Sequence, residues 1–158
     1  VMHCGDEFYA LSKIGPYTFA PYMVAARDNS KFCASVISPT QTPWGEWKHS
    51  ICVKHTIIIS QDISGNNITE DEAHYVNGIL NSSIVREYIH STFKTNGFSL
   101  NKAHLCIPKY EMGNVRCMRI SQLSKEATGN EAKREDIIAL LTKEYVRLCR
   151  ETKKSRII

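Results

Sequence analysis

The chain of 158 residues is long enough for one domain with a hydrophobic core, with or without a helical appendage. Its hydrophobic content of 42% and charged content of 23% are those of an ordinary globular domain, and no apolar run is long enough to span a membrane. The formal net charge of +4 permits a nucleic-acid partner but does not establish one.

The start of the chain and its cysteines bear on where the protein acts. Residues 1–4 do not resemble a signal peptide, and the lack of methionine at position 1 predicts a fragment of a longer protein. The six cysteines are scattered without a Cys-x-x-Cys pair, so neither a zinc site nor a disulfide framework is predicted. We expect reduced thiols in a cytoplasmic protein; a metal cluster built from histidines and distant cysteines is the less favoured alternative.

The stretch Ile14–Val24 contains two prolines, one glycine and three aromatic residues. Each proline restricts its own φ and keeps the residue before it out of the helical region. The composition therefore predicts a stiff, kinked, extended segment that presents its aromatic side chains in fixed directions. We expect Phe19 in the core, whereas Tyr17 is left open between the core and a binding surface.

The first sixty residues are rich in strand signals. Phe8–Ser12 reads as a short strand, and Tyr22–Arg27 and Lys31–Ile37, joined by three turn-forming residues, predict a β-hairpin. A loop containing two tryptophans is predicted over Ser38–Trp47. Ile51–Ser60 ends in an apolar run typical of a buried strand.

Helix signals follow. Thr69 and Glu72 form a capping box, which predicts the start of an amphipathic helix. Asn81-Ser82-Ser83 interrupts that helix and begins a second one, and for Asn81 and Ser82 we favour helix capping over DNA contact.

The remainder of the chain completes the predicted fold. Leu105–Ile107 is expected to be a short strand, and Val115–Ala127 and Glu131–Lys153 are expected to be helices. Strands followed by helices, without βαβ alternation, predict an α+β fold. We expect a small twisted, mostly antiparallel sheet packed with helices, plus a C-terminal helical extension.

A search for catalytic motifs assigns no catalytic residue. Dinucleotide, P-loop, serine-hydrolase and zinc-protease motifs are missing from the sequence, as is the Asn/Asp-Pro-Pro-Tyr loop of a methyltransferase. Glu46-Trp47-Lys48 has the Glu-x-Lys spacing of magnesium-dependent nucleases, but no Pro-Asp precedes it. A stand-alone nuclease using Glu46 and Lys48 is therefore a minor alternative, and neither a metal nor a cofactor is predicted for this chain.

Three segments carry a resemblance to a known family. They are Ser12–Val24, Glu72–Ile89 with its Leu-Asn-Ser sequence, and Ile107–Tyr110 followed by Leu123–Ala127. In this order they resemble the target recognition domains of adenine-specific DNA methyltransferases in restriction–modification systems. The second segment is also similar to type I specificity subunits. Met23 departs from the pattern, because similar proteins often carry lysine there.

The resemblance implies a division of labour between two domains. Residues 1–128 would form a DNA target recognition domain, and residues 129–158 a C-terminal helix that serves as a tail or spacer. The implied partners are double-stranded DNA and a catalytic methyltransferase domain of the parent chain, with no membrane. That missing domain would bind S-adenosylmethionine and flip the target adenine, with or without a fused endonuclease, while this module contacts the surrounding bases.

Candidate DNA-binding residues are basic, amide and aromatic side chains on loops from the sheet. Arginine and lysine pair with guanine or phosphate, and glutamine and asparagine pair with adenine. Two tryptophans in a polar loop are not both expected to be buried, and they either stack on DNA or pack against the missing catalytic domain. The candidates are Arg27, Asn29, Lys31, Gln41, Trp44, Trp47, Lys48, His49 and Lys54. The alternative function is a protein-interaction or subunit-assembly module that uses the last helix and the tryptophan loop.

Overall fold

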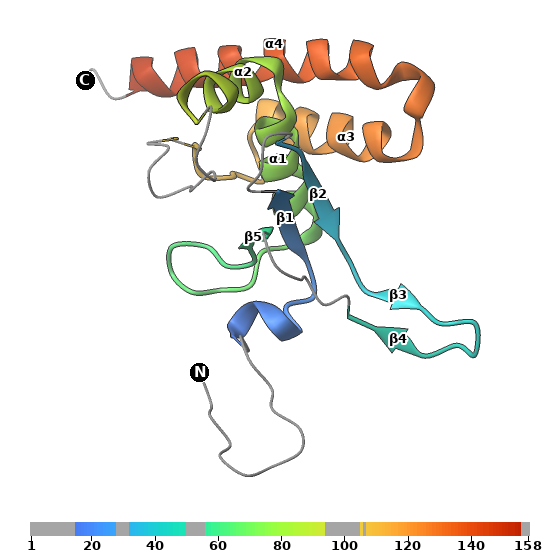
Figure 1. The fold of residues 1–158 in the computed structure, drawn as a ribbon. Coiled ribbons are helices and arrows are strands. Elements are labelled where there is room, and N and C mark those ends of the chain that lie inside the picture. The colour runs from blue at the N-terminus through green and yellow to red at the C-terminus, as the bar shows by residue number, and fades with distance from the viewer. Residues whose placement is uncertain (1–14, 28–31, 50–55, 94–104, 106, 156–158) are drawn as a thin grey trace.

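The structure is a computed structural model that describes residues 15–27, 32–49, 56–93, 105 and 107–155 (Figure 1). The predicted strand Phe8–Ser12 lies outside the described residues. Within them the chain is mixed α+β, which confirms the predicted fold class, including the C-terminal helix. The elements in chain order are η1 (Pro16–Phe19), β1 (Met23–Arg27), β2 (Ala34–Ile37), β3 (Thr40–Gln41), β4 (Trp47–Lys48), β5 (Thr56–Ile59), α1 (Glu70–Asn81), α2 (Ser83–Thr92), α3 (Val115–Gly129), η2 (Glu131–Lys133) and α4 (Arg134–Ser155).

The three-stranded antiparallel sheet has the order β2-β1-β5. Met23 pairs with Ile37 and Ala26 with Ala34, which confirms the predicted hairpin. Strand β5 pairs with β1 alone in this sheet, and all four of its residues are half-buried. The predicted strand is confirmed at residues 56–59, but these residues are half-buried rather than buried because β5 lies at an edge of the sheet. Residues 51–55 of the predicted strand lie outside the described part.

The proline-rich stretch contains a short helical turn that the sequence did not predict. Gly15 and Ala20 are extended, but between them a 3₁₀ turn begins at a proline and places the Thr18 N–H 2.9 Å from the Gly15 carbonyl oxygen. This turn directs Phe19 to solvent with 72% of its surface exposed, so the prediction of a core phenylalanine is wrong. Tyr17 is half-buried and its ring lies against Gly15, where a Cβ would be 2.6 Å from Tyr17 Cε1.

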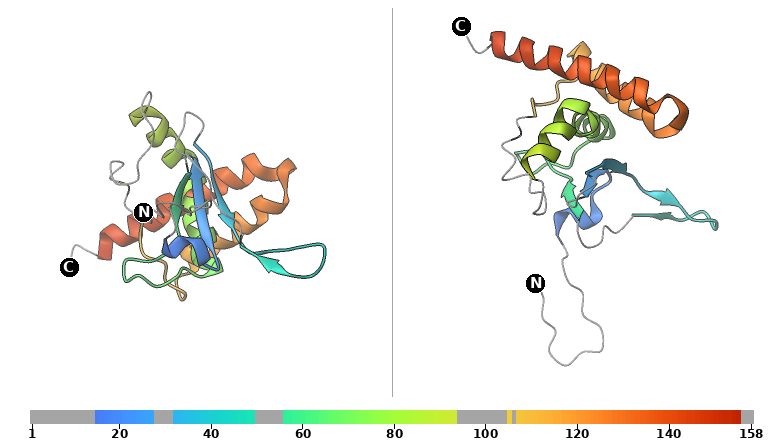
Figure 2. Two further views of the ribbon diagram at one scale, coloured as in Figure 1. Left: turned by 60° about the horizontal axis from the view of Figure 1, so that its bottom comes forward. Right: turned by 45° about the horizontal axis from the view of Figure 1, so that its top comes forward.

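Helix α1 lies at the centre of the molecule (Figures 1 and 2). It contacts β1 and β2 on one side and α3 and α4 on the other. Its start is the predicted capping box, in which Thr69 Oγ1 accepts from the Glu72 N–H and the Glu72 carboxylate accepts from the Thr69 N–H at 2.8 Å. Contact on both sides explains why seven of its twelve residues are buried, including Ala73 and Gly78.

The break between α1 and α2 is confirmed, and Ser82 occupies the N-cap position of α2, but neither its side chain nor that of Asn81 caps this helix. The Ser82 hydroxyl donates to the Ile79 carbonyl oxygen at 2.6 Å and caps nothing in α2. Instead, Thr142 Oγ1 of α4 accepts from the Ser83 N–H at 2.9 Å, so a distant helix satisfies the first donor of α2. The Asn81 side chain bonds to strand β2, as described below.

Helices α3 and α4 form an antiparallel pair that closes the core (Figure 1). Arg116 of α3 bridges Glu144 and Glu151 of α4, with both N–O distances 2.8 Å. Helix α4 contributes Leu141 and Leu148 to the same hydrophobic core that contains residues of the sheet and of α1. Residues 105 and 107 have no regular secondary structure, so the predicted strand is wrong at the two of its three positions that are described.

Candidate nucleic-acid interface

A two-stranded ribbon of residues 40–48, here called the β3–β4 ribbon, projects from the three-stranded sheet (Figures 1 and 2). Thr40 pairs with Lys48 and Gln41 with Trp47 in antiparallel register. The sequence predicted a loop over Ser38–Trp47, and that prediction is wrong at the paired positions. Strands of two residues are too short to show the alternation on which strand prediction depends.

The turn of the ribbon is closed by its own backbone and side chains. The Thr42 N–H donates to the Glu46 carbonyl oxygen at 2.7 Å, and the Gly45 N–H donates to the Thr42 carbonyl oxygen at 2.9 Å. Gly45 has a φ of 91°, a conformation that glycine adopts without steric cost. Gln41 Nε2 also donates to the Gly45 carbonyl oxygen at 3.1 Å. These bonds give the ribbon a defined shape although it extends away from the core.

Both tryptophans of the ribbon are exposed, Trp44 by 66% and Trp47 by 68%, which agrees with the expectation that they are not both buried. Lys48 Nζ lies 5.2 Å from the centre of the Trp44 ring, a cation–π contact that places these two side chains together. Because successive strand residues alternate, we expect the Trp47 side chain on the face of β4 opposite that of Lys48. The ribbon would then present an aromatic ring on each face.

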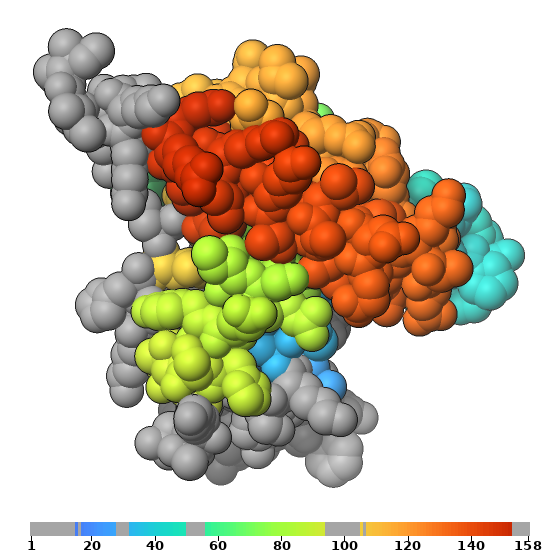
Figure 3. All heavy atoms as spheres, turned by 90° about the horizontal axis from the view of Figure 1, so that it is seen from above, coloured from blue at the N-terminus to red at the C-terminus, as the bar shows by residue number. Residues whose placement is uncertain are grey.

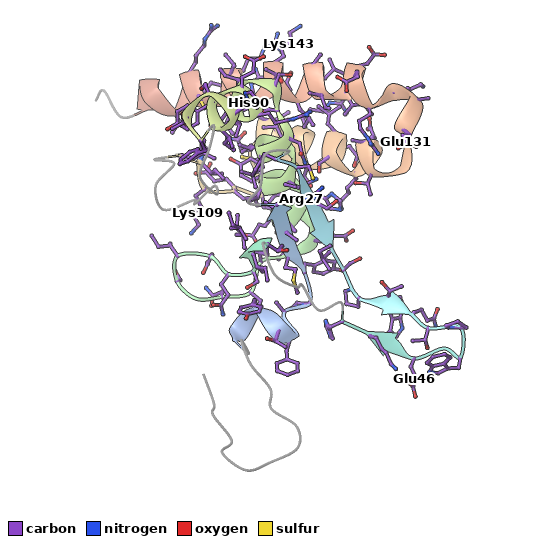
Figure 4. All side chains as sticks on the ribbon, viewed as in Figure 1. Arg27, Glu46, His90, Lys109, Glu131 and Lys143 are labelled. Atoms are coloured by element: carbon purple, nitrogen blue, oxygen red, sulfur yellow. The ribbon has the colours of Figure 1, made fainter. Side chains whose placement is uncertain are left out.

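The Glu46 carboxylate is held near the end of the ribbon (Figure 4). Its Oε2 accepts from Trp44 Nε1 at 3.0 Å and lies 4.0 Å from Lys48 Nζ. This ion pair is exposed and adds little stability, so its main effect is to hold the Glu46 carboxylate in place. Within the described residues, no three His, Cys, Asp or Glu side chains lie close enough to hold a metal ion.

Arg27 is exposed at the end of β1 and does not adjoin the ribbon. The β2 residue that leads toward the ribbon, Ile37, pairs with Met23 at the other end of β1. Figure 4 accordingly shows Arg27 and Glu46 well apart. The sheet thus separates Arg27 from the ribbon by the length of β1.

The structure brings together five of the predicted site residues and leaves Arg27 apart from them. Those on or directly after the β3–β4 ribbon, all outside the buried core, are Gln41, Trp44, Trp47, Lys48 and His49. Asn29, Lys31 and Lys54 lie outside the described residues.

A buried polar network, which sequence reasoning missed, connects α1, α3 and the sheet. Asn77 Nδ2 donates to Ser124 Oγ at 2.9 Å, and His74 Nδ1 lies 3.3 Å from the same oxygen. Asn81 Nδ2 continues the network to Asn77 Oδ1 at 3.0 Å and to the Ala34 carbonyl oxygen at 2.8 Å. Ser124 is only 1% exposed, so a substrate has no access to its hydroxyl. The network therefore organises the fold rather than supporting catalysis.

Burial favours a neutral His74. Ser124 Oγ accepts from Asn77 Nδ2 and lies 3.3 Å from His74 Nδ1, to which its hydroxyl donates when that nitrogen is unprotonated and from which it accepts when that nitrogen carries a proton. Burial lowers the pKa of His74, and the positive charge of Lys125 lowers it further, against the opposing effects of Glu70 and Asp71. Protonation of His74 therefore disfavours the folded state.

This pKa shift predicts a loss of stability in mild acid. Below the ordinary histidine pKa of 6.5 the unfolded chain binds a proton that folded His74 does not, so the free energy of unfolding falls as the pH drops from 6.5 toward the lower folded pKa. Between neutral pH and one unit below 6.5 we expect the free energy of unfolding measured by urea unfolding to fall. The free energy of unfolding should depend less steeply on pH in His74→Gln. It should keep its ordinary pH dependence in His90→Gln, which changes an exposed residue of α2. Equal slopes in all three proteins would contradict this role of His74.

An open groove with a volume of about 370 Å³ lies between α2 and α4 (Figure 3). Two of its residues, Ile84 and Tyr88, are exposed by 46% and 38%. No local sequence signal reveals the groove, because its walls lie about sixty residues apart in the chain. Its lining residues are Ile84, Val85, Tyr88, Leu105, Tyr145, Val146, Cys149 and Arg150.

Neither the helices nor comparison with other proteins adds an identity. None of the described helices combines the length and apolar character needed to cross a membrane. Searches against protein families, characterised proteins and solved structures found no match for this chain.

Proposed function

We propose that this chain is a duplex-DNA recognition module whose β3–β4 ribbon enters a DNA groove. The observation that carries the proposal is the projection of a preformed ribbon with two exposed tryptophans and Lys48. The major groove of B-DNA is wide enough for a two-stranded β-ribbon. Lys48 would contact phosphate, Gln41 a base edge, and the tryptophans the sugar or base surfaces.

The sequence resemblance supports the wider assignment that belongs to this proposal. The module would direct a restriction–modification adenine methyltransferase to its site, with the catalytic domain and its S-adenosylmethionine elsewhere in the parent protein. A separate recognition module needs no catalytic residues, because base flipping and methyl transfer take place in the other domain. The ribbon would then provide contacts to bases outside the flipped adenine.

The direct test is DNA binding by the 158-residue chain, measured by fluorescence anisotropy with a labelled mixed-sequence duplex. We expect weak binding that falls steeply with salt, because phosphate contacts release counterions. Lys48→Ala should reduce the slope of log affinity against log salt by about one, the amount expected for one lost phosphate contact. Lys143→Ala removes an exposed lysine of α4, remote from the ribbon in Figure 4, and should leave the slope unchanged.

Replacing both tryptophans by alanine should weaken DNA binding by about thirtyfold or more, because aromatic contacts with nucleotides are each worth about 1–3 kcal/mol. Both rings are mostly exposed, so the midpoint of thermal unfolding should hardly change. Phe19→Ala, which removes an exposed aromatic side chain from η1, provides the matched control. Failure of the unmodified chain to bind duplex DNA even at low salt would overturn the proposed function.

The groove between α2 and α4 favours a second candidate function, a protein-interaction or subunit-assembly module. Ile84 and Tyr88 expose apolar surface beside this groove. Sedimentation velocity distinguishes the two functions. A tight dimer that does not bind DNA would favour assembly, and a DNA-binding monomer would favour recognition.

A further inference from the structure

The Glu46 carboxylate has one oxygen engaged and one open. Oε2 is held by Trp44 Nε1 at 3.0 Å and lies 4.0 Å from Lys48 Nζ. No donor from the described part of the chain bonds to Oε1. The side chain is 66% exposed and lies at the outer part of the ribbon (Figure 4). The ribbon therefore presents an oriented hydrogen-bond acceptor at the place that would enter a groove.

A carboxylate at such a place is selective among bases. DNA carries one negative charge for about every 1.7 Å of its helix axis, which repels a carboxylate. In the major groove, cytosine N4 and adenine N6 are the groups that donate hydrogen bonds, whereas guanine and thymine present acceptors. Lys48 offsets part of the repulsion from phosphate. The carboxylate is thus tolerated where it faces an amino group and rejected where it faces an acceptor.

We infer that Glu46 is a specificity-determining residue that selects a base with an amino group in the major groove, cytosine before adenine. Cytosine is preferred because the adenine amino group adjoins the N7 acceptor, which repels the second carboxylate oxygen. The inference rests on the proposed function and assigns a role to the Glu-x-Lys pair other than magnesium binding.

The test is selection by the 158-residue chain from a pool of duplex DNA with randomised positions, followed by sequencing of the bound fraction. At one position we expect cytosine over guanine or thymine by roughly tenfold, the usual discrimination at a contacted base. Glu46→Gln should reduce that preference to about twofold, because the amide donates as well as accepts. Its amide oxygen still accepts from Trp44, so the ribbon keeps its shape. Preferences at other positions should persist.

Two further variants make the outcome decisive. Glu46→Ala should also lose the preference at this position, whereas Glu87→Gln, the same loss of charge at an exposed site on α2, should leave every preference intact. If both Glu46 variants bind all sequences more tightly with preferences unchanged, the carboxylate only repels phosphate and the inference is wrong. If the unmodified chain does not bind DNA, the proposed function itself is overturned. If the bound DNA shows base preferences and none of them changes in the Glu46 variants, only this inference is overturned and the proposed function stands.

Discussion

Replacing Gly78 by valine is expected to lower the free energy of unfolding by about 3 kcal/mol, because helix α1 has no room for a side chain at this position. A Cβ built on Gly78 lies 2.9 Å from Ile120 Cγ2, 3.0 Å from Leu141 Cδ2 and 3.2 Å from the Ile120 carbonyl oxygen. The backbone oxygen moves only if α3 moves with it. Valine adds two more methyl groups to this space, so α3 and α4 must separate from α1. Urea unfolding followed by circular dichroism measures the loss.

Gly129 provides the matched control, because it also lies in a helix but a Cβ added there would meet no other part of the described chain within 4 Å. Valine there should change the free energy of unfolding by no more than about 0.5 kcal/mol, since its helix propensity slightly exceeds that of glycine. Similar effects at the two positions would mean that propensity rather than packing determines the result at Gly78.

Replacing Asn81 by aspartate is expected to cost about 3 kcal/mol of stability, although the two side chains have nearly the same shape. Asn81 Nδ2 donates to the Ala34 carbonyl oxygen at 2.8 Å, to the Asn77 carbonyl oxygen at 3.1 Å and to Asn77 Oδ1 at 3.0 Å. Aspartate would place a negative oxygen against these three acceptors. Only the bond from the Ala34 N–H to Oδ1, at 3.2 Å, would remain. Urea unfolding followed by circular dichroism measures this loss as well.

The control for this prediction is Asn114→Asp at the start of α3. Asn114 Oδ1 only accepts, from the Arg116 N–H at 2.9 Å and the Cys117 N–H at 3.3 Å. Aspartate caps a helix as well as asparagine does, so this change should be neutral or slightly stabilising. A comparable loss in both variants would show that Asn81 does not depend on its donor group.

Features that are satisfied within a few residues were predicted correctly. The capping box at Thr69 and Glu72 closes over three residues, and the antiparallel hairpin β1–β2 needs only a short turn between strands of suitable composition. That Trp44 and Trp47 are not both buried also followed from their polar neighbours. Such features depend on local geometry and composition, which the sequence contains.

Features whose partners lie far away in the chain were not predicted. Asn81 has the local signature of a cap, but its side chain bonds to Ala34, 47 residues away. Ser83 would ordinarily need a cap from its own neighbourhood, yet Thr142 satisfies its N–H from α4, 59 residues away. In both cases a tertiary partner replaced the local hydrogen bond that propensity predicts.

The sequence by itself determined the α+β class, the hairpin and the helices, because apolar periodicity and capping residues act over one or two turns. Only the tertiary structure decided that residues 40–48 form a projecting ribbon, that this ribbon carries Gln41 and Lys48 but lies away from Arg27, and that His74 joins a buried network. Those outcomes depend on strand register and helix packing, which bring together residues tens of positions apart and leave no local pattern in the sequence.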